Sequence, residues 1–277
     1  AGTQTPVQVG VDGKARFIGK LPSVGHSVFH LRAGAAAELA TRATPRQMEN
    51  AYLRVEFDAR GCVSRVWDRR AGRDVLAPGS AGNRFVVFED KMATCGPAWD
   101  MEVYYNDKPL EQDGTLLSAK VVEQGSVRSL VRFRRRISKS IITQDVVLSA
   151  ASARLDFVTT IDWHKDEKDV ILKVAFPVNV RAEKARYEIQ FGSVERPTHW
   201  NRPQDFGMFE VPAQKWVDLS ESGYGVALLN DCKYGHDTRG NVMRLTLLRA
   251  PKSPGKTADV GKAHSVTYAL FPHIGPF

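Results

Sequence analysis

Short stretches of alternating apolar and polar residues recur along most of the chain and are separated by turn residues. In the first clear example, Leu53, Val55 and Phe57 alternate with charged residues, which is the period of a strand with one buried face. The period of about 3.6 residues that marks an amphipathic helix is almost absent. The pattern therefore predicts an all-β protein, a large antiparallel β-sandwich. The further strands expected are 63–68, 84–89, 118–124, 129–137, 141–148, 154–163, 170–178, 185–190, 217–219, 226–229, 242–248 and 264–271.

Three short strands are expected before this sandwich, at residues 7–11, 15–18 and 27–31, with a turn at Asp12-Gly13. So few short strands do not bury a core by themselves. Residues 1–32 are therefore predicted to be the remnant of a small β-sandwich that was cut from a larger unit.

The next segment, residues 33–49, is rich in alanine and then polar, with Pro45. We predict a linker here, and a short helix over residues 35–40 is the alternative because alanine favours helices. Residues 50–277 are assigned to the large sandwich. The chain stops just after an apolar strand, so truncation of the sandwich at its C-terminus is expected.

A strand, a polar loop and a second strand are predicted between Tyr224 and Arg249. Residues 226–229 form a continuous apolar run, as in a strand covered on both faces. Residues 230–241 are rich in glycine, asparagine and charged residues, as in a loop. Such a hairpin gathers polar side chains at one end of a sheet, which is where a β-domain commonly meets a ligand. These side chains are Asn230, Asp231, Lys233, Tyr234, His236 and Asp237.

Other motifs accompany this loop in a fixed order. They are 53–58, 71–76, 98–100, 191–199, 216–220, 223–225 and 247–253. With the loop, they make residues 50–273 resemble the C-terminal β-domain of the glycoside hydrolase family 38 α-mannosidases. The resemblance implies the supersandwich fold shared with galactose mutarotase-like domains. It also implies a fragment, because the family's N-terminal catalytic α/β domain, with a divalent metal, zinc, and an aspartate nucleophile, has no counterpart here.

For the parent protein, the resemblance implies hydrolysis of terminal α-linked mannose with retention of configuration. The present chain is then a non-catalytic domain that buttresses the missing catalytic domain and lends residues to its cleft. The partners implied are that domain and a mannose-containing carbohydrate. The fragment alone is predicted to be inactive, with no catalytic residue and no cofactor of its own.

Two interpretations of the loop stay open. In the structural one, Asn230 and Asp231 cap a turn through bonds to the backbone. In the functional one, Lys233, with Asn230 and Tyr234, reaches into a neighbouring sugar cleft, since lysine offers three donors and a fixed charge. The family's equivalent loop carries a basic residue after an aspartate, and the resemblance matches Asp231 to that aspartate and Lys233 to the basic position.

A second candidate sugar contact is the pair Trp99 and Asp100. An aromatic face stacks on the C–H surface of a sugar and a carboxylate accepts bonds from its hydroxyls, although such a pair also occurs in packed corners. A stand-alone carbohydrate-binding module is therefore one alternative function. The other is a mutarotase-like sugar epimerase, which needs a glutamate base and a histidine acid. Glu195 and His199 are the nearest such pair, and their closeness on one segment argues against this chemistry.

The net charge of +8 raises the question of a nucleic-acid or membrane partner. The densest basic run is 132–136, where a strand would place Arg132, Arg134 and Arg136 on one face and Arg135 with Val131 and Phe133 on the other. The exposed face is either solvated or a contact for the missing domain. No basic stretch interleaved with aromatic residues supports nucleic acid, and no run of about 18 apolar residues supports a transmembrane helix.

Cysteine and histidine usage points to a cytoplasmic protein without a metal. The three cysteines, Cys62, Cys95 and Cys232, are too few and too far apart for a disulfide framework or a structural zinc. The N-terminus lacks the regions of a signal peptide. Of the seven histidines, His26 and His30 have a helical metal spacing but lie in a predicted strand, so no metal site is expected.

Overall fold

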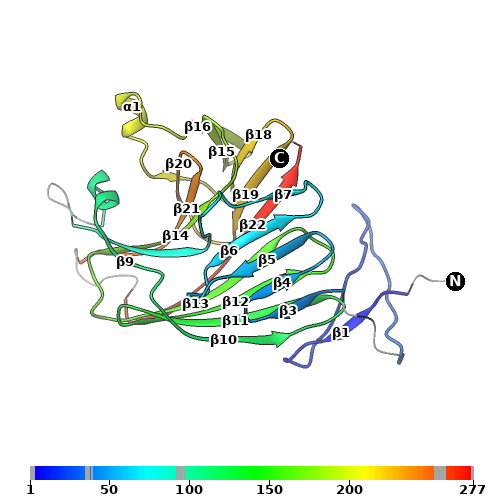
Figure 1. Cartoon of the computed structure of the whole chain (residues 1–277). Helices are drawn as coiled ribbons and strands as arrows, with labels where there is room; N and C mark the ends of the chain where they lie inside the picture. Colours follow the sequence, from blue (N-terminus) through cyan, green and yellow to red (C-terminus); the bar gives the residue numbers. More distant parts are fainter. Residues whose placement is uncertain are drawn as a thin grey trace.

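Four antiparallel sheets make up the computed structural model, which describes residues 4–34, 38, 40–91, 96, 98–252 and 260–275. The largest sheet has nine strands and forms one layer of the molecule (Figure 1). In spatial order these strands are β10 (Thr115–Glu123), β11 (Arg128–Ile137), β12 (Ser140–Ser149), β13 (Leu155–Trp163), β22 (Lys262–Ile274), β19 (Tyr224–Asn230), β18 (Trp216–Glu221), β15 (Lys184–Ile189) and β16 (Gly192–Pro197).

Two smaller sheets face the nine-stranded sheet, and together they form the second layer. The six-stranded sheet runs β17 (Val211–Pro212), β20 (Gly235–Arg239), β21 (Val242–Ala250), β14 (Val170–Pro177), β8 (Arg84–Glu89) and β9 (Pro109–Gln112). The five-stranded sheet runs β3 (Arg42–Thr44), β4 (Gln47–Glu49), β5 (Leu53–Phe57), β6 (Val63–Asp68) and β7 (Arg73–Asp74). One isolated β-bridge links Leu76, which follows β7, to Val178, which follows β14, and another links Val63 of β6 to Gly82, which precedes β8.

One hydrophobic core fills the space between the layers. Phe157 of the nine-stranded sheet packs on Phe176 of the six-stranded sheet, with ring centroids 5.6 Å apart, and on Tyr268 at 5.2 Å. Phe57 of the five-stranded sheet meets Phe133 at 4.9 Å. The expected large antiparallel β-sandwich is confirmed. In the part of the chain that the structure describes, helix is limited to α1 (Pro203–Phe206) and a 3-10 turn, η1 (Val103–Asp107). Within the described residues, no helix is long and apolar enough to cross a membrane.

Strand β11 shows how alternation sets the two faces of a strand. Arg132, Arg134 and Arg136 are exposed, and Arg132 forms a paired contact with Asp145 at 2.6 and 2.7 Å. Arg135 points into the core as the pattern predicts. Its guanidinium lies over the Phe85 ring and donates to the backbone carbonyls of Asp113 and Gly61 at 3.1 and 3.0 Å. The basic run is therefore one exposed stripe with one buried arginine, not a continuous cationic patch.

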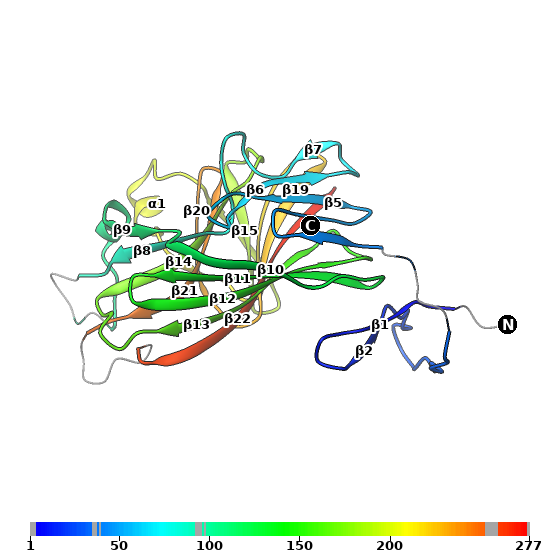
Figure 2. The ribbon, with the colours of Figure 1, turned by 60° about the horizontal axis from the view of Figure 1, so that its bottom comes forward.

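The N-terminal residues lie to one side of the sandwich, as Figure 2 shows. Strands β1 (Val7–Val9) and β2 (Ala15–Phe17) form a hairpin. The hairpin is attached through Gln8, whose side-chain oxygen accepts bonds from the Val127 and Arg128 amides at 2.9 Å each. The strand expected at residues 27–31 is wrong, because these residues are exposed and pair with no neighbouring strand.

The expected linker at 33–49 also differs from the structure. Its second half contains β3 and β4, which extend the five-stranded sheet. Met48 is completely buried there, but two three-residue strands are too short to show a clear alternation in sequence. The alternative helix at 35–40 falls mostly outside the described residues.

Candidate functional site

The loop between β19 and β20 carries most of the side chains singled out from the sequence, but its surroundings differ from the prediction. The predicted hairpin is wrong, because β19 belongs to the nine-stranded sheet while β20 and β21 belong to the six-stranded sheet. Residues 231–234 therefore cross from one layer to the other. His236 and Asp237, expected in the loop, lie in β20 and are buried. The sequence pattern did not predict β20 because both residues are polar. In the structure, buried partners described below compensate the burial of these polar groups.

Asn230 holds the first turn of this crossing. Its side-chain oxygen accepts bonds from the amides of Cys232 (3.1 Å) and Lys233 (2.6 Å). Its side-chain nitrogen donates to the Gln214 carbonyl at 3.1 Å and lies 3.4 Å from the His236 ring nitrogen Nε2. The Asn230 side chain is buried and all its bonding groups are used. Asn230 therefore shapes the loop.

The other three candidates in the loop point outward. The backbone of Asp231 is fixed on both sides, since its amide donates to the Thr267 carbonyl at 3.0 Å and its carbonyl accepts from the Lys215 ammonium. The side chains of Asp231 and Tyr234 are exposed, and that of Lys233 is half-buried. A fixed backbone with outward polar side chains presents groups to a neighbouring molecule with little loss of conformational entropy.

The ring of His236 is uncharged at neutral pH. Burial lowers the pKa of its ring from 6.5 to about 4. The neutral ring instead fills the space behind the loop, next to the Asn230 amide.

A buried ionic network lies beside β20 and was not predicted. The Lys173 ammonium, completely buried on β14, donates to Asp237 at 2.7 Å and also to Glu210. Arg244 donates to the other oxygen of Asp237 at 2.6 Å. The hydroxyl of Tyr105 donates to Glu210 at 2.9 Å. The network therefore ties η1 and the segment before β17 to the outer face of the six-stranded sheet.

Opposite charges compensate the burial of this network. Burial alone disfavours the ammonium, yet the Asp237 and Glu210 carboxylates hold the pKa of Lys173 above its ordinary value. Burial would likewise raise the pKa of Asp237, but Lys173 and Arg244 outweigh it and lower that pKa. Lys173 and Asp237 therefore keep their charges at neutral pH, and both are hydrogen-bonded within the network. The network suits a structural role better than proton transfer.

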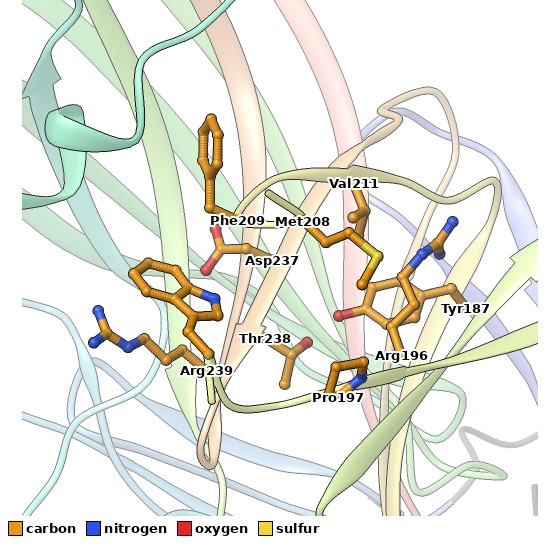
Figure 3. A pocket seen from close by; sticks show the side chains of 10 residues that line it. Tyr187, Arg196, Pro197, Met208, Phe209, Val211, Asp237, Thr238 and Arg239 are labelled. Carbon is orange, nitrogen blue, oxygen red and sulfur yellow. The ribbon is translucent and has the colours of Figure 1, made fainter. Parts of the chain in front are cut away.

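A small cavity borders this network on one side (Figure 3). Figure 3 shows Asp237 and Phe209 on one side of it and Tyr187 and Arg196 on the other. Its volume of about 10 Å³ is enough for about one water molecule and far below the several hundred Å³ of a small-molecule site. No sugar ring fits there. The full lining is Tyr187, Arg196, Pro197, Trp200, Met208, Phe209, Val211, Asp237, Thr238 and Arg239.

The second predicted pair, Trp99 and Asp100, is attached to another part of the molecule. The Asp100 carbonyl accepts from Arg249 of β21, and its carboxylate accepts from the Met101 amide at 2.8 Å. Trp99 has 74% of its surface exposed, so it is not a packed corner. This pair precedes η1 in the chain, whereas the 231–234 loop is anchored on β22 and on Lys215, the residue before β18.

The two cysteines in the described part of the chain differ in exposure. Burial raises the pKa of the Cys62 thiol to about 12, whereas Cys232 is exposed. Cys95 lies outside the described residues. In the described ranges, no group of three or more His, Cys, Asp or Glu side chains is arranged to hold a metal ion.

Comparison with known proteins gives a consistent result. A family model described as the glycosyl hydrolases family 38 C-terminal domain matches residues 48–257. The chain is 45% identical over 234 residues to alpha-mannosidase 2C1 of Homo sapiens, covering 83% of this chain and 22% of that protein. It is 41% identical over 238 residues to alpha-mannosidase G of Dictyostelium discoideum, covering 82% of this chain and 21% of that protein.

A solved structure supports the fold. The crystal structure of an alpha-mannosidase from Enterococcus faecalis V583 matches with a TM-score of 0.67 at 18% identity, over 87% of this chain and 30% of that one. The present chain thus spans about a fifth of the length of the curated relatives named above.

Proposed function

Because the chain belongs to the glycosyl hydrolase family 38 C-terminal domain family, we propose that it is the non-catalytic β-domain of an α-mannosidase that hydrolyses terminal α-linked mannose. The parent enzyme is proposed to retain configuration and to use a divalent metal, zinc, held in a catalytic domain outside this chain. The observation that carries this proposal is the extent of the family match, which fills most of this chain yet only about a fifth of the relatives.

The role proposed for the domain is to buttress the catalytic domain and to lend residues to its mannose-binding cleft. Lys233 and Asp231 are the first candidates, with Tyr234 beside them. Support comes from the loop itself, whose backbone is bonded to Lys215 and to β22, while Asp231 and Tyr234 are exposed and Lys233 is half-buried. Asn230 contributes by holding Lys233 in place. Trp99 and Asp100 are proposed as a separate contact with carbohydrate or with the catalytic domain.

The domain division proposed follows from the same comparison. Residues 1–32 are proposed to be the end of a small β-sandwich, and support comes from the apolar side chains that this part exposes to solvent, such as Val9, Leu21 and Val24. The large sandwich is proposed to begin at β3, which leaves a linker shorter than the 33–49 predicted from sequence. A cytoplasmic location is proposed because Cys62 and Cys232 are both free thiols.

A stand-alone carbohydrate-binding module is the second candidate, and the exposed Trp99 beside the Asp100 carboxylate favours it. Isothermal titration with mannose and mannobiose separates the two, since a buttress has almost no affinity for sugar alone. A sugar epimerase has little support. Glu195 lies on the edge strand β16 within 3.4 Å of both Lys184 and Arg186, while His199 lies 3.6 Å from Asp205. The glutamate and the histidine therefore have separate partners.

The direct test is an assay with an aryl α-mannoside in the presence of zinc. The present chain is expected to give no turnover, and the full-length protein that contains it is expected to be active. In that protein, Lys233→Ala is expected to lower kcat/KM by about tenfold or more, as for the loss of one charged contact at about 1.4 kcal/mol. Val158→Ser, at an exposed position on β13, is the control. Turnover by the present chain alone, or an inactive full-length protein, would contradict the proposal.

A further inference from the structure

The turn between β15 and β16 has an unusual composition. Ile189 pairs with Gly192, so Gln190 and Phe191 form a two-residue turn. Phe191 has a φ of 58°, in the left-handed region that is unfavourable for a bulky side chain and is normally taken by glycine or asparagine. Its ring is fully exposed. Neither local conformation nor burial in this chain accounts for a phenylalanine at this position.

This turn lies on the same edge of the molecule as the 231–234 loop, and hydrogen bonds trace the connection. The Glu188 carbonyl accepts from the Gln214 amide at 3.1 Å, and the Glu188 carboxylate accepts from the Lys215 amide at 2.6 Å. The Lys215 carbonyl in turn accepts from the Asn230 amide at 2.8 Å. The C-terminal ends of β15 and β19 and the N-terminal end of β18 therefore lie side by side.

We call the surface formed by these strand ends the loop edge. It consists of Ile189, Phe191, Lys215, Asp231, Lys233 and Tyr234. Its apolar members are unusually accessible, since Tyr234 is 57% and Ile189 37% exposed besides Phe191. Aromatic side chains ringed by charged ones are the composition of a protein–protein contact in which an aromatic residue inserts into a pocket of the partner.

We propose that the loop edge is the surface that docks on the N-terminal catalytic part of the same polypeptide, with Phe191 as its anchor. This inference rests on the function proposed above. The relatives supply a partner large enough, since about four-fifths of their length lies outside the matched region. The ammonium groups of Lys215 and Lys233 suit such a partner, because the active site of a glycosidase is rich in carboxylates.

A second copy of this chain is a poorer occupant. In a two-fold dimer the same patch meets itself, which would bring Lys215 and Lys233 of both copies into one contact. Docking on the catalytic part also has a functional consequence. Phe191 and Lys233 would then belong to the same contact surface, so that the contact that holds the two domains together also fixes how far Lys233 reaches into the cleft.

Hydroxyl-radical footprinting tests the contact without a mutation. The oxidation rates of Phe191 and Tyr234 are compared between the present chain and the full-length protein. Docking predicts a decrease of about fivefold or more for both side chains in the full-length protein. Val158, exposed on the outer face of β13, serves as the reference and is expected to keep its rate. An unchanged rate for Phe191 would overturn the proposal.

The variant Phe191→Gly separates docking from folding. Glycine adopts the left-handed conformation freely, so the isolated chain should melt at the same or a higher temperature than the parent sequence. In the full-length protein the same change should lower kcat/KM on an aryl α-mannoside by about tenfold, the size of a hot-spot loss. Full activity in this variant would also overturn the proposal.

The two proposals fail in different ways. If the full-length protein is inactive on α-mannosides, the proposed function is wrong whatever Phe191 contacts. If it is active but Phe191 is equally oxidised in both proteins, only the docking surface is wrong.

Discussion

Replacement of Lys173 by methionine tests the buried ionic network most directly. Methionine resembles the lysine stem in length and is apolar, so the change removes the charge with little change in packing. It leaves Asp237 with Arg244 alone and Glu210 with the hydroxyls of Tyr105 and Thr246. Removal of one partner of a buried ion pair costs about 3–5 kcal/mol. For a chain of this size this corresponds to a decrease in Tm of about 6–20 °C.

The pH dependence of this loss has a definite sign. The Lys173 pKa is raised in the folded state above its ordinary 10.5, so its contribution to stability is fully present below about pH 10.5 and is lost as the pH rises through the folded value. The difference in the free energy of unfolding between the parent and Lys173→Met should therefore be constant between about pH 6 and 9. This difference in the free energy of unfolding should become smaller above about pH 10.5.

Urea denaturation followed by circular dichroism measures both quantities. Lys139→Met, which removes an exposed lysine, is the matched control and should change the free energy of unfolding by less than about 0.5 kcal/mol. The double variant Lys173→Met with Glu210→Gln should be less destabilised than the sum of its parts, because the groups share one network. A loss below about 1 kcal/mol for Lys173→Met would refute the reasoning.

Three further predictions follow from the loop and the thiols. Asn230→Ala should lose about 1–3 kcal/mol of stability by leaving two amides without an acceptor, and should speed hydrogen exchange at Cys232 and Lys233; unchanged exchange would show that the cap is unimportant. The His236 ring has a folded pKa of about 4 against 6.5, so the unfolded state binds the proton first and stability should fall by about 3 kcal/mol between pH 6.5 and 4. An NMR titration of the ring checks this, and a midpoint near 6.5 would contradict it. Cys62, with a pKa of about 12, should resist iodoacetamide at pH 8 in the native chain and react only after denaturation, as mass spectrometry of the labelled peptides will show.

The alternation of residues was enough to predict most strands and the sides they bury. Strand β11 is the clearest case, since a run of arginines was correctly divided into three exposed residues and one buried residue. Alternation worked there because one face of the strand is apolar apart from Ser129 and Arg135. The short strands β3 and β4 were missed because three residues do not establish a period.

The candidate site was predicted less completely, for a different reason. Strand β20 was assigned to a loop because it contains His236 and Asp237, and its burial depends on Lys173, which is 64 residues away from Asp237 in sequence. Lys173 lies inside the predicted strand 170–178, where it is a charged residue among apolar ones. This isolated charge was the signal in the sequence that pointed to a buried ionic network. Sequence pattern reports what a residue prefers locally, whereas the compensation of a buried charge is decided by distant partners.

The crossing at residues 231–234 has a consequence for how the domain tolerates change. Its first half is bonded to the nine-stranded layer, through Thr267 and Lys215, and the chain then enters β20 in the opposite layer. The segment therefore connects the two layers, and its conformation depends on the distance between them. A core substitution that increases the distance between the layers by a fraction of an ångström would therefore change the position of the Lys233 side chain without contacting it. Such a protein would remain folded and yet, under the proposed function, would support the catalytic domain less well.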